Sequence, residues 1–318
     1  MDSSVELLWP GIHPYVMWLA AGALISLCVL FFDVRRNGIS FKTGLYFALT
    51  AIPLGVIGAK LFYFFAKFEL LYALHGLGGL LRFRIGEFAF TGVLLGMLAA
   101  AAISALLTRQ KPQKVMDAVA ASSMLFLALA RFGEYFVEFG TGPYVYNESI
   151  QFFPLAVKNI YDEWYAAVFM LEGLIALILF LLIFLRRFAG AYHKSDVGLL
   201  LFVLSQVFCE SLRAESLKWG FVRVQQLSCV VLAAVILFKY TIQIIKNGGG
   251  IGKILPQIGI FLLGIGICVG VEFALDKTNI PQPVSYAAML LALFAMGTVT
   301  LLQMRAAWTF KNSTVESI

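Results

Sequence analysis

The sequence predicts an all-α protein, a polytopic bundle of membrane-spanning helices. Of its 318 residues, 61% are hydrophobic and only 13% are charged, whereas a soluble domain has roughly 25% charged residues. Mean hydropathy is +0.88. Long apolar runs recur along the chain, and Lys and Arg residues gather in alternate loops between them. A water-soluble protein of this size could not bury so much apolar surface, so lipid is expected to be its main solvent.

Nine apolar runs are long enough to be transmembrane helices, each of which needs about 20 residues. They lie at 14–33, 43–67, 86–108, 115–136, 164–185, 197–214, 223–243, 254–274 and 283–303. The run at 197–214 is the weakest, because its second half contains polar residues. The first dozen residues lack the basic region and cleavage site of a signal peptide, so the first run is expected to be an uncleaved span.

The basic residues predict the orientation, since cytoplasmic loops carry an excess of Lys and Arg. The basic loops contain Arg35, Arg36 and Lys42; Arg109, Lys111 and Lys114; Arg186, Arg187 and Lys194; Lys246 and Lys253; Arg305 and Lys311. The N-terminus is therefore expected outside and the C-terminus in the cytoplasm. Two outer segments are also basic, and they contain Arg82 and Arg84, and Arg213, Lys218 and Arg223. Contact with lipid headgroups and binding of an anionic ligand explain them equally well.

Two polar stripes lie at membrane depth, where ionisable residues indicate functional sites. In each stripe the spacing puts three side chains on one helical face. The stripes are Arg131, Glu134 and Glu138 at the outer end of the fourth span, and Gln206, Glu210 and Arg213 in the sixth. Because lipid cannot satisfy such groups, we expect a polar chamber between spans four and six near the outer leaflet. The alternative is that Arg131–Glu134 and Glu210–Arg213 are internal ion pairs that hold the bundle together.

Other residues are less informative. The loop 140–143, Gly-Thr-Gly-Pro, could bring backbone N–H groups close to a phosphate, although such turns are common. The four cysteines are expected to be buried apolar residues rather than a metal site or disulfides. Glu172, Glu272 and Asp117 are interpreted as ordinary contacts between helices.

Six segments together resemble a known family. They are His13-Pro14-Tyr15-Val16, Gly58-Ala59-Lys60-Leu61-Phe62-Tyr63, Phe88-Ala89-Phe90-Thr91-Gly92-Val93-Leu94-Leu95-Gly96, Ala130-Arg131-Phe132-Gly133-Glu134-Tyr135-Phe136, Gln206-Val207-Phe208-Cys209-Glu210-Ser211-Leu212-Arg213 and Gln225-Gln226-Leu227-Ser228. Their order and spacing over about residues 10–245 resemble the bacterial prolipoprotein diacylglyceryl transferases, which are seven-span enzymes of the cytoplasmic membrane. No single segment is specific, but the ordered set is.

The resemblance implies transfer of a diacylglyceryl group from phosphatidylglycerol to the lipobox cysteine of a prolipoprotein, with release of glycerol phosphate. It implies no cofactor, metal or nucleic-acid partner. The candidate catalytic residues are Tyr15 and Glu210. The candidate substrate-binding residues are Arg131, Glu134, Gly142, Gln206, Arg213 and Thr91. Among these, Arg131 matches the arginine that binds the headgroup, where a planar guanidinium suits phosphate.

The chain departs from the family pattern at important positions. Thr91 replaces a His or Tyr, Glu134 replaces an Asn, and Gln206 replaces an Arg. The family's His-Pro-Ser-Gln-Leu-Tyr-Glu motif appears as 162–168 with almost nothing kept. The chamber is therefore expected to be about two charges more negative than in the family, which weakens phosphate binding and would suit a zwitterionic or cationic headgroup.

Three functional hypotheses follow. The first is a divergent diacylglyceryl transferase, the second a family member with another lipid or acceptor or without catalysis, and the third a transporter. A transporter would show internal repeats with broken helices, and no convincing repeat is found. The predicted organisation is a transferase-like membrane core at 1–247, followed at 248–318 by two additional spans and a cytoplasmic tail.

Overall fold

The structure of the chain is a computed structural model, and it describes residues 13–82, 84, 86–137, 139–185, 192–219, 222–277 and 280–316. The α-helices are α1 (Pro14–Arg36), α2 (Phe41–Ala66), α3 (Phe68–His75), α4 (Phe90–Leu107), α5 (Pro112–Gly133), α6 (Val168–Phe184), α7 (Lys194–Leu212), α8 (Val224–Lys246), α9 (Ile251–Lys277) and α10 (Gln282–Glu316). Short 3₁₀ helices are η1 (Gly76–Leu81), η2 (Glu134–Phe136) and η3 (Glu148–Ile150), and the strands are β1 (Ala156–Lys158), β2 (Trp164–Ala166), β3 (Lys218–Trp219) and β4 (Val222–Arg223).

The predicted fold class is confirmed. Within the described residues, eight helices are long and apolar enough to cross a bilayer, namely α1, α2, α4, α5, α7, α8, α9 and α10. The fifth predicted span corresponds to α6, a mostly apolar helix of 17 residues that begins later than expected, at Val168. It begins there because Trp164–Ala166 pairs with Ala156–Lys158 in a small antiparallel sheet outside the helices.

One element was not predicted. The second predicted span runs to Lys67, but the chain continues as α3 and η1 before α4 begins. Several large apolar side chains of this segment are exposed, among them Leu70, Leu74, Leu77 and Leu81. An exposed apolar helical segment next to a span is suited to lie in the membrane interface.

Helices α2 and α4 approach so closely that only glycine fits between them. A Cβ atom added to Gly92 would lie 2.1 Å from the carbonyl oxygen of Gly58 on the facing helix. Small residues of this kind let helix backbones pack closely in lipid, where little hydrophobic force drives association. The glycines of these two family-like segments therefore allow the close packing of α2 against α4.

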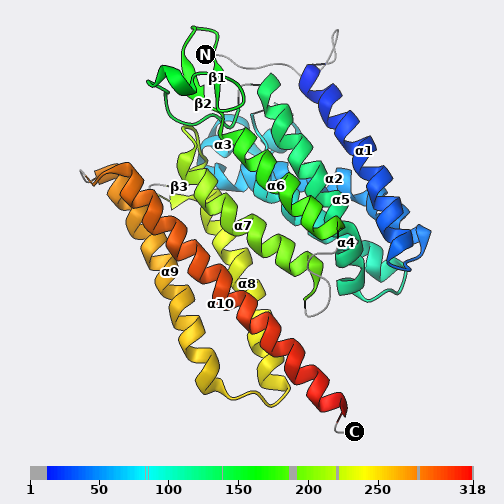
Figure 1. Cartoon of the computed structure of the whole chain (residues 1–318). Coiled ribbons are helices and arrows are strands. Elements are labelled where there is room, and N and C mark those ends of the chain that lie inside the picture. Colours follow the sequence, from blue (N-terminus) through cyan, green and yellow to red (C-terminus); the bar gives the residue numbers. More distant parts are fainter. Residues whose placement is uncertain are drawn as a thin grey trace.

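The last two helices are integrated into the bundle. Figure 1 shows α9 and α10 as an antiparallel pair beside α7 and α8. Buried residues of all four helices form one apolar cluster, including Val203, Leu237, Phe261 and Met289. The division at 247/248 stays a prediction, but α9 and α10 share a core with the preceding helices.

The predicted cytoplasmic loops meet at one end of the bundle. The Lys114 ammonium donates to the Gly38 carbonyl at 3.3 Å, and Lys194 donates to Asn37 at 3.3 Å. Asp117 accepts from Ser195 and contacts His193 at the same end. Arg131 and Glu210 of the two polar stripes lie near the other ends of α5 and α7.

Candidate functional site

Arg131, near the C-terminal end of α5, lies at the centre of a buried polar cluster. Its Nη1 donates to Glu134 three residues later, and its Nε lies 2.7 Å from Glu172 Oε2 on α6. Its Nη2 donates to Gln206 Oε1 on α7 at 3.2 Å, and the guanidinium stacks 4.2 Å from the ring centroid of Phe90. Only 4% of the side chain is exposed. Every nitrogen of this guanidinium is therefore engaged within the protein.

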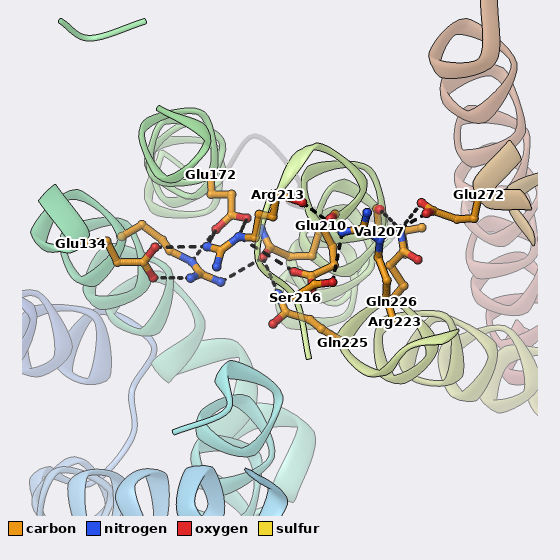
Figure 2. A network of polar contacts seen from close by, with 12 residues as sticks. Glu134, Glu172, Val207, Glu210, Arg213, Ser216, Arg223, Gln225, Gln226 and Glu272 are labelled. Atoms are coloured by element: carbon orange, nitrogen blue, oxygen red, sulfur yellow. Dashed lines mark hydrogen bonds and ion pairs between the residues drawn. The ribbon is translucent and has the colours of Figure 1, made fainter. Parts of the chain in front are cut away.

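Arg213, directly after α7, forms the second half of the cluster. It binds Glu172 through two contacts, Nε to Oε1 at 2.9 Å and Nη2 to Oε2 at 2.7 Å. The same Nη2 contacts Glu134 Oε2 at 3.1 Å. Paired parallel contacts of this type are the strongest arginine–carboxylate geometry. We call Arg131, Arg213, Glu134 and Glu172 the arginine cluster (Figure 2).

The predicted chamber is thus built by three helices rather than two. Arg131 and Gln206 connect spans four and six as expected. The sequence interpretation of Glu172 as a contact between helices did not identify its partners: it is fully buried on α6 and bridges both arginines. The predicted Glu210–Arg213 pair is present only as a longer contact of 3.9 Å, because Arg213 is turned toward Glu172. Glu138 lies outside the described residues.

Glu210 differs from the other two carboxylates. It is 2% exposed, and its Oε2 has no hydrogen-bond partner in the described structure. Glu134, by contrast, has one oxygen on each arginine. A buried carboxylate oxygen without a partner is costly to maintain and indicates a functional role. Among the acidic side chains around Arg131, Glu210 therefore has the oxygen that is free to accept a proton.

A second group of contacts extends the polar network away from the cavity. Arg223, at the start of α8, donates from Nη1 to the carbonyl oxygens of Glu210 at 2.7 Å and Arg213 at 3.1 Å. Its Nε contacts Glu272 Oε2 on α9 at 3.2 Å. Figure 2 shows the contacts running from Glu134 to Glu272. The sequence interpretation of Glu272 as an ordinary helix contact understated its position.

A large cavity with a volume of about 1300 Å³ borders the arginine cluster. Its apolar walls come from four helices and include Leu19, Leu27, Phe47, Ile52, Val93, Met97, Phe126 and Leu127. Its polar lining includes Tyr15, Thr91, Arg131, Glu134, Glu210 and Arg213. Apolar walls with a few convergent polar groups are typical of a small-molecule site, and here the molecule must be amphipathic.

Three cations outside the arginine cluster also line the cavity, and we call Lys67, Arg82 and Arg84 the outer cations. Arg82 contacts the His75 ring, and both Arg82 and Arg84 are exposed. Within the described residues, neither Lys67 nor Arg84 has an ion pair. The other cation of this region, Lys60, is neutralised by Glu87 at 2.5 Å.

Tyr15 and Thr91 are two further predicted site residues that line the cavity. Tyr15 lies near the start of α1, packed beside Gly133, where a Cβ atom would lie 2.6 Å from Trp18 Cδ1 and 3.3 Å from Tyr15 Cδ2. Thr91 is buried and lines the cavity.

Gly142 has a packing role in this structure. Its N–H donates to the Ala166 carbonyl at 2.7 Å, and a Cβ atom there would lie 2.7 Å from Val168. This N–H is therefore not directed at a ligand, contrary to the sequence-based expectation for the loop. Gly140 is the glycine that touches the site, since it has φ +72° and lines the cavity beside Glu134 and Arg213.

Sequence comparison places these residues in a family. The model of the family "Prolipoprotein diacylglyceryl transferase" matches residues 5–242. The phosphatidylglycerol–prolipoprotein diacylglyceryl transferase of Clostridium kluyveri is 30% identical over 229 residues, which cover 70% of this chain and 86% of the relative. An enzyme of the same name from Clostridium perfringens is 26% identical over 255 residues, covering 77% and 93%. The chain belongs to the prolipoprotein diacylglyceryl transferase family.

Proposed function

We propose that this multi-pass membrane protein transfers a diacylglyceryl group from phosphatidylglycerol to the lipobox cysteine of a prolipoprotein. The observation that carries the proposal is the amphipathic cavity, whose apolar walls suit acyl chains and whose polar lining contains the family's candidate residues. Family membership and the names of the relatives support the same reaction. We also propose that the cavity end with Tyr15 faces outward, with the N-terminus outside and the C-terminus in the cytoplasm.

The reaction requires a base and a stabilised leaving group. The thiol sulfur attacks the glycerol carbon that bears the phosphate ester, a carbon–sulfur bond forms, and the carbon–oxygen bond breaks. Glycerol phosphate leaves with the bonding electrons, and the thiol proton passes to a base. Glu210 suits this role, because its Oε2 accepts no hydrogen bond in the described structure and the residue lines the cavity. Thr91 cannot substitute for the family's histidine as a base.

The charges around the cavity favour an anionic donor. The sequence predicts a chamber about two charges more negative than the family pattern. Among the described residues, the cavity is nevertheless lined by five cations, namely Lys67, Arg82, Arg84, Arg131 and Arg213, against the three acids Glu134, Glu210 and Glu215, a net charge of +2. If Glu172, which pairs with both arginines, is included, the net charge falls to +1.

The outer cations are therefore proposed to compensate the phosphate. Arg131 is already surrounded by two carboxylates and an amide. A third anion at about 4 Å from a carboxylate is repelled by roughly 4 kcal/mol at an effective dielectric of 20. We propose that Arg131 orients Glu134 and Gln206 at the polar end, while Lys67, Arg82 and Arg84 attract the headgroup.

A transfer assay tests the proposal directly. Purified protein in vesicles of phosphatidylglycerol is mixed with a lipobox peptide, and the peptide mass is followed. We expect a diacylglyceryl adduct, release of glycerol phosphate, and no product from a peptide whose cysteine is replaced by serine. Complementation of a cell depleted of its own transferase provides the matching test in the membrane.

The second candidate function is lipid binding without transfer, or transfer with another lipid. Two observations favour this second candidate. The guanidinium of Arg131 is already engaged by Glu134, Glu172 and Gln206, and the buried Thr91 stands where the family has a histidine. Vesicles of phosphatidylethanolamine in place of phosphatidylglycerol distinguish a changed donor. Saturable binding of phosphatidylglycerol with no peptide adduct would identify a binding protein.

A further inference from the structure

Glu272 connects a helix outside the family-matched region to the site. It lies on α9, whereas the family model ends at residue 242 within α8. Its carboxylate accepts from Ser211 on α7, from Gln226 Nε2 at 2.7 Å and from Arg223 Nε at 3.2 Å. The added helix pair therefore supplies the only acidic partner that the structure gives Arg223 within the described residues.

Arg223 passes this contact on to the end of α7. Its Nη1 donates to the carbonyls of Glu210 and Arg213 and to Ser216 Oγ at 3.2 Å. The last carbonyls of a helix have no partner within the helix, and a basic side chain that binds them fixes the helix end. This helix end carries Glu210, which faces the cavity, and Arg213, which binds Glu172 and Glu134.

Charge explains why Glu272 is required in this arrangement. The side chain of Arg223 is 13% exposed and that of Glu272 is 21% exposed, so both are largely withdrawn from solvent. If Arg223 loses the carboxylate of Glu272, its buried charge is no longer compensated. The guanidinium is then expected to leave the backbone carbonyls and to bind water or another anion instead. Glu210 and the arginine-cluster carboxylates cannot take the place of Glu272, because the site itself needs them.

We infer that Glu272 is a positioning residue for the site, and that α9 is a working part of the enzyme rather than an appended anchor. This inference rests on the proposed transfer function. Glu272 holds Arg223, Arg223 holds the C-terminal end of α7, and this fixes Glu210 relative to the substrate. Glu272 does not line the cavity and touches no substrate.

A second contact of the same helix pair provides a matched control. Thr241 on α8 donates to Gln303 Oε1 on α10 at 2.8 Å, and Gln303 is fully buried. This bond also ties the last two helices to the bundle, but it contacts none of the site residues. If the added helices only stabilise the bundle, loss of either contact has the same consequence.

The experiment compares Glu272→Gln with Gln303→Leu in the full chain. Transfer to a lipobox peptide is measured at several phosphatidylglycerol concentrations, well below the thermal midpoint of each variant. We expect Glu272→Gln to lower kcat by about tenfold to a hundredfold, since displacement of a catalytic group by an ångström has such effects, with KM changed less than kcat. Gln303→Leu is expected to keep kcat within about twofold, and Glu272→Asp, which restores the charge, to recover part of the loss.

Amide hydrogen exchange gives a readout that does not depend on activity. Glu272→Gln should accelerate exchange in residues 211–216 relative to wild type, and Gln303→Leu should not. If wild type transfers and Glu272→Gln matches Gln303→Leu in both kcat and exchange, the inference is overturned. If wild type transfers nothing, the proposed function fails, and exchange in 211–216 alone decides whether Glu272 positions this segment.

Discussion

The replacement Glu172→Gln tests whether the arginine cluster depends on its buried carboxylate. The amide has nearly the same shape as the carboxylate, so the change removes a charge and leaves the volume of α6 intact. In the native cluster Glu172 contacts Arg131 Nε at 2.7 Å and Arg213 Nη2 at 2.7 Å. After the change, both guanidinium groups share only Glu134.

The expected cost is large because Glu172 is fully buried. Each arginine–carboxylate attraction is roughly 4 kcal/mol at 4 Å and an effective dielectric of 20. Part of it is recovered by the hydrogen bonds that Gln still accepts, and removal of one partner from a buried ion pair costs about 3–5 kcal/mol. We expect Glu172→Gln to lower the free energy of unfolding by about this amount. Transfer activity should fall as well, since Arg131 and Arg213 lose their common anchor.

The matched control is Asp196→Asn, another carboxylate-to-amide change on a buried acid. Asp196 binds Lys239 at 2.6 Å, but the lysine side chain is 40% exposed, so water can solvate the ammonium group. The Tyr240 hydroxyl also donates to Asp196 at 2.6 Å, and the amide oxygen of asparagine can still accept this bond. We expect a loss of about 1 kcal/mol or less and normal transfer. Unfolding is followed by tryptophan fluorescence during a titration with sodium dodecyl sulfate in mixed micelles. A loss for Glu172→Gln no larger than that for Asp196→Asn would refute the reasoning.

Three further predictions concern the base, the outer cations and helix packing. Glu210→Gln should lower kcat by about 10²-fold or more, as expected for loss of a general base, while equilibrium binding of phosphatidylglycerol remains. Arg82→Gln and Arg84→Gln should each raise KM for phosphatidylglycerol by up to about fivefold, the limit for a single exposed charge pair, with kcat unchanged; equal KM values in low and high salt for wild type would count against this. Gly92→Ala should lower the free energy of unfolding by about 1–3 kcal/mol, because its Cβ would lie 2.1 Å from a backbone carbonyl of α2.

The spans were predictable because each is a long apolar run bounded by charged residues, and lipid leaves few alternatives to a helix. The boundaries of the spans were less predictable than their existence. Residues 68–81 form a shorter apolar segment, which the structure divides into α3 and η1. The apolar run predicts that the fifth span begins at 164, whereas Trp164 and Tyr165 pair with β1.

The polar stripes on α5 and α7 were also predictable, since ionisable residues at helical spacing stand out in an apolar sequence. The acidic residues that these stripes contact on other helices were not predictable. Glu172 lies in a helix that is apolar on every side, so periodicity gives no indication of which neighbour it faces. Glu272 is separated by 49 residues from Arg223, and no local pattern joins them. Such contacts depend on helix rotation and packing, which a single sequence does not encode in its hydropathy.

Two of the departures from the family motifs, those at 134 and 206, have a common explanation in the structure. Glu134 replaces an asparagine and Gln206 an arginine, and both side chains contact the same guanidinium, that of Arg131. An arginine at 206 would place a second cation beside Arg131, whereas Gln206 accepts its hydrogen bond and Glu134 supplies a charge that Arg213 shares. The two replacements are therefore compatible with each other. Either one alone would fit the contacts of Arg131 less well. Positive charge is retained at the outer cations of the same cavity, so we interpret the departures as a rearrangement of the site's charges and not as loss of the site.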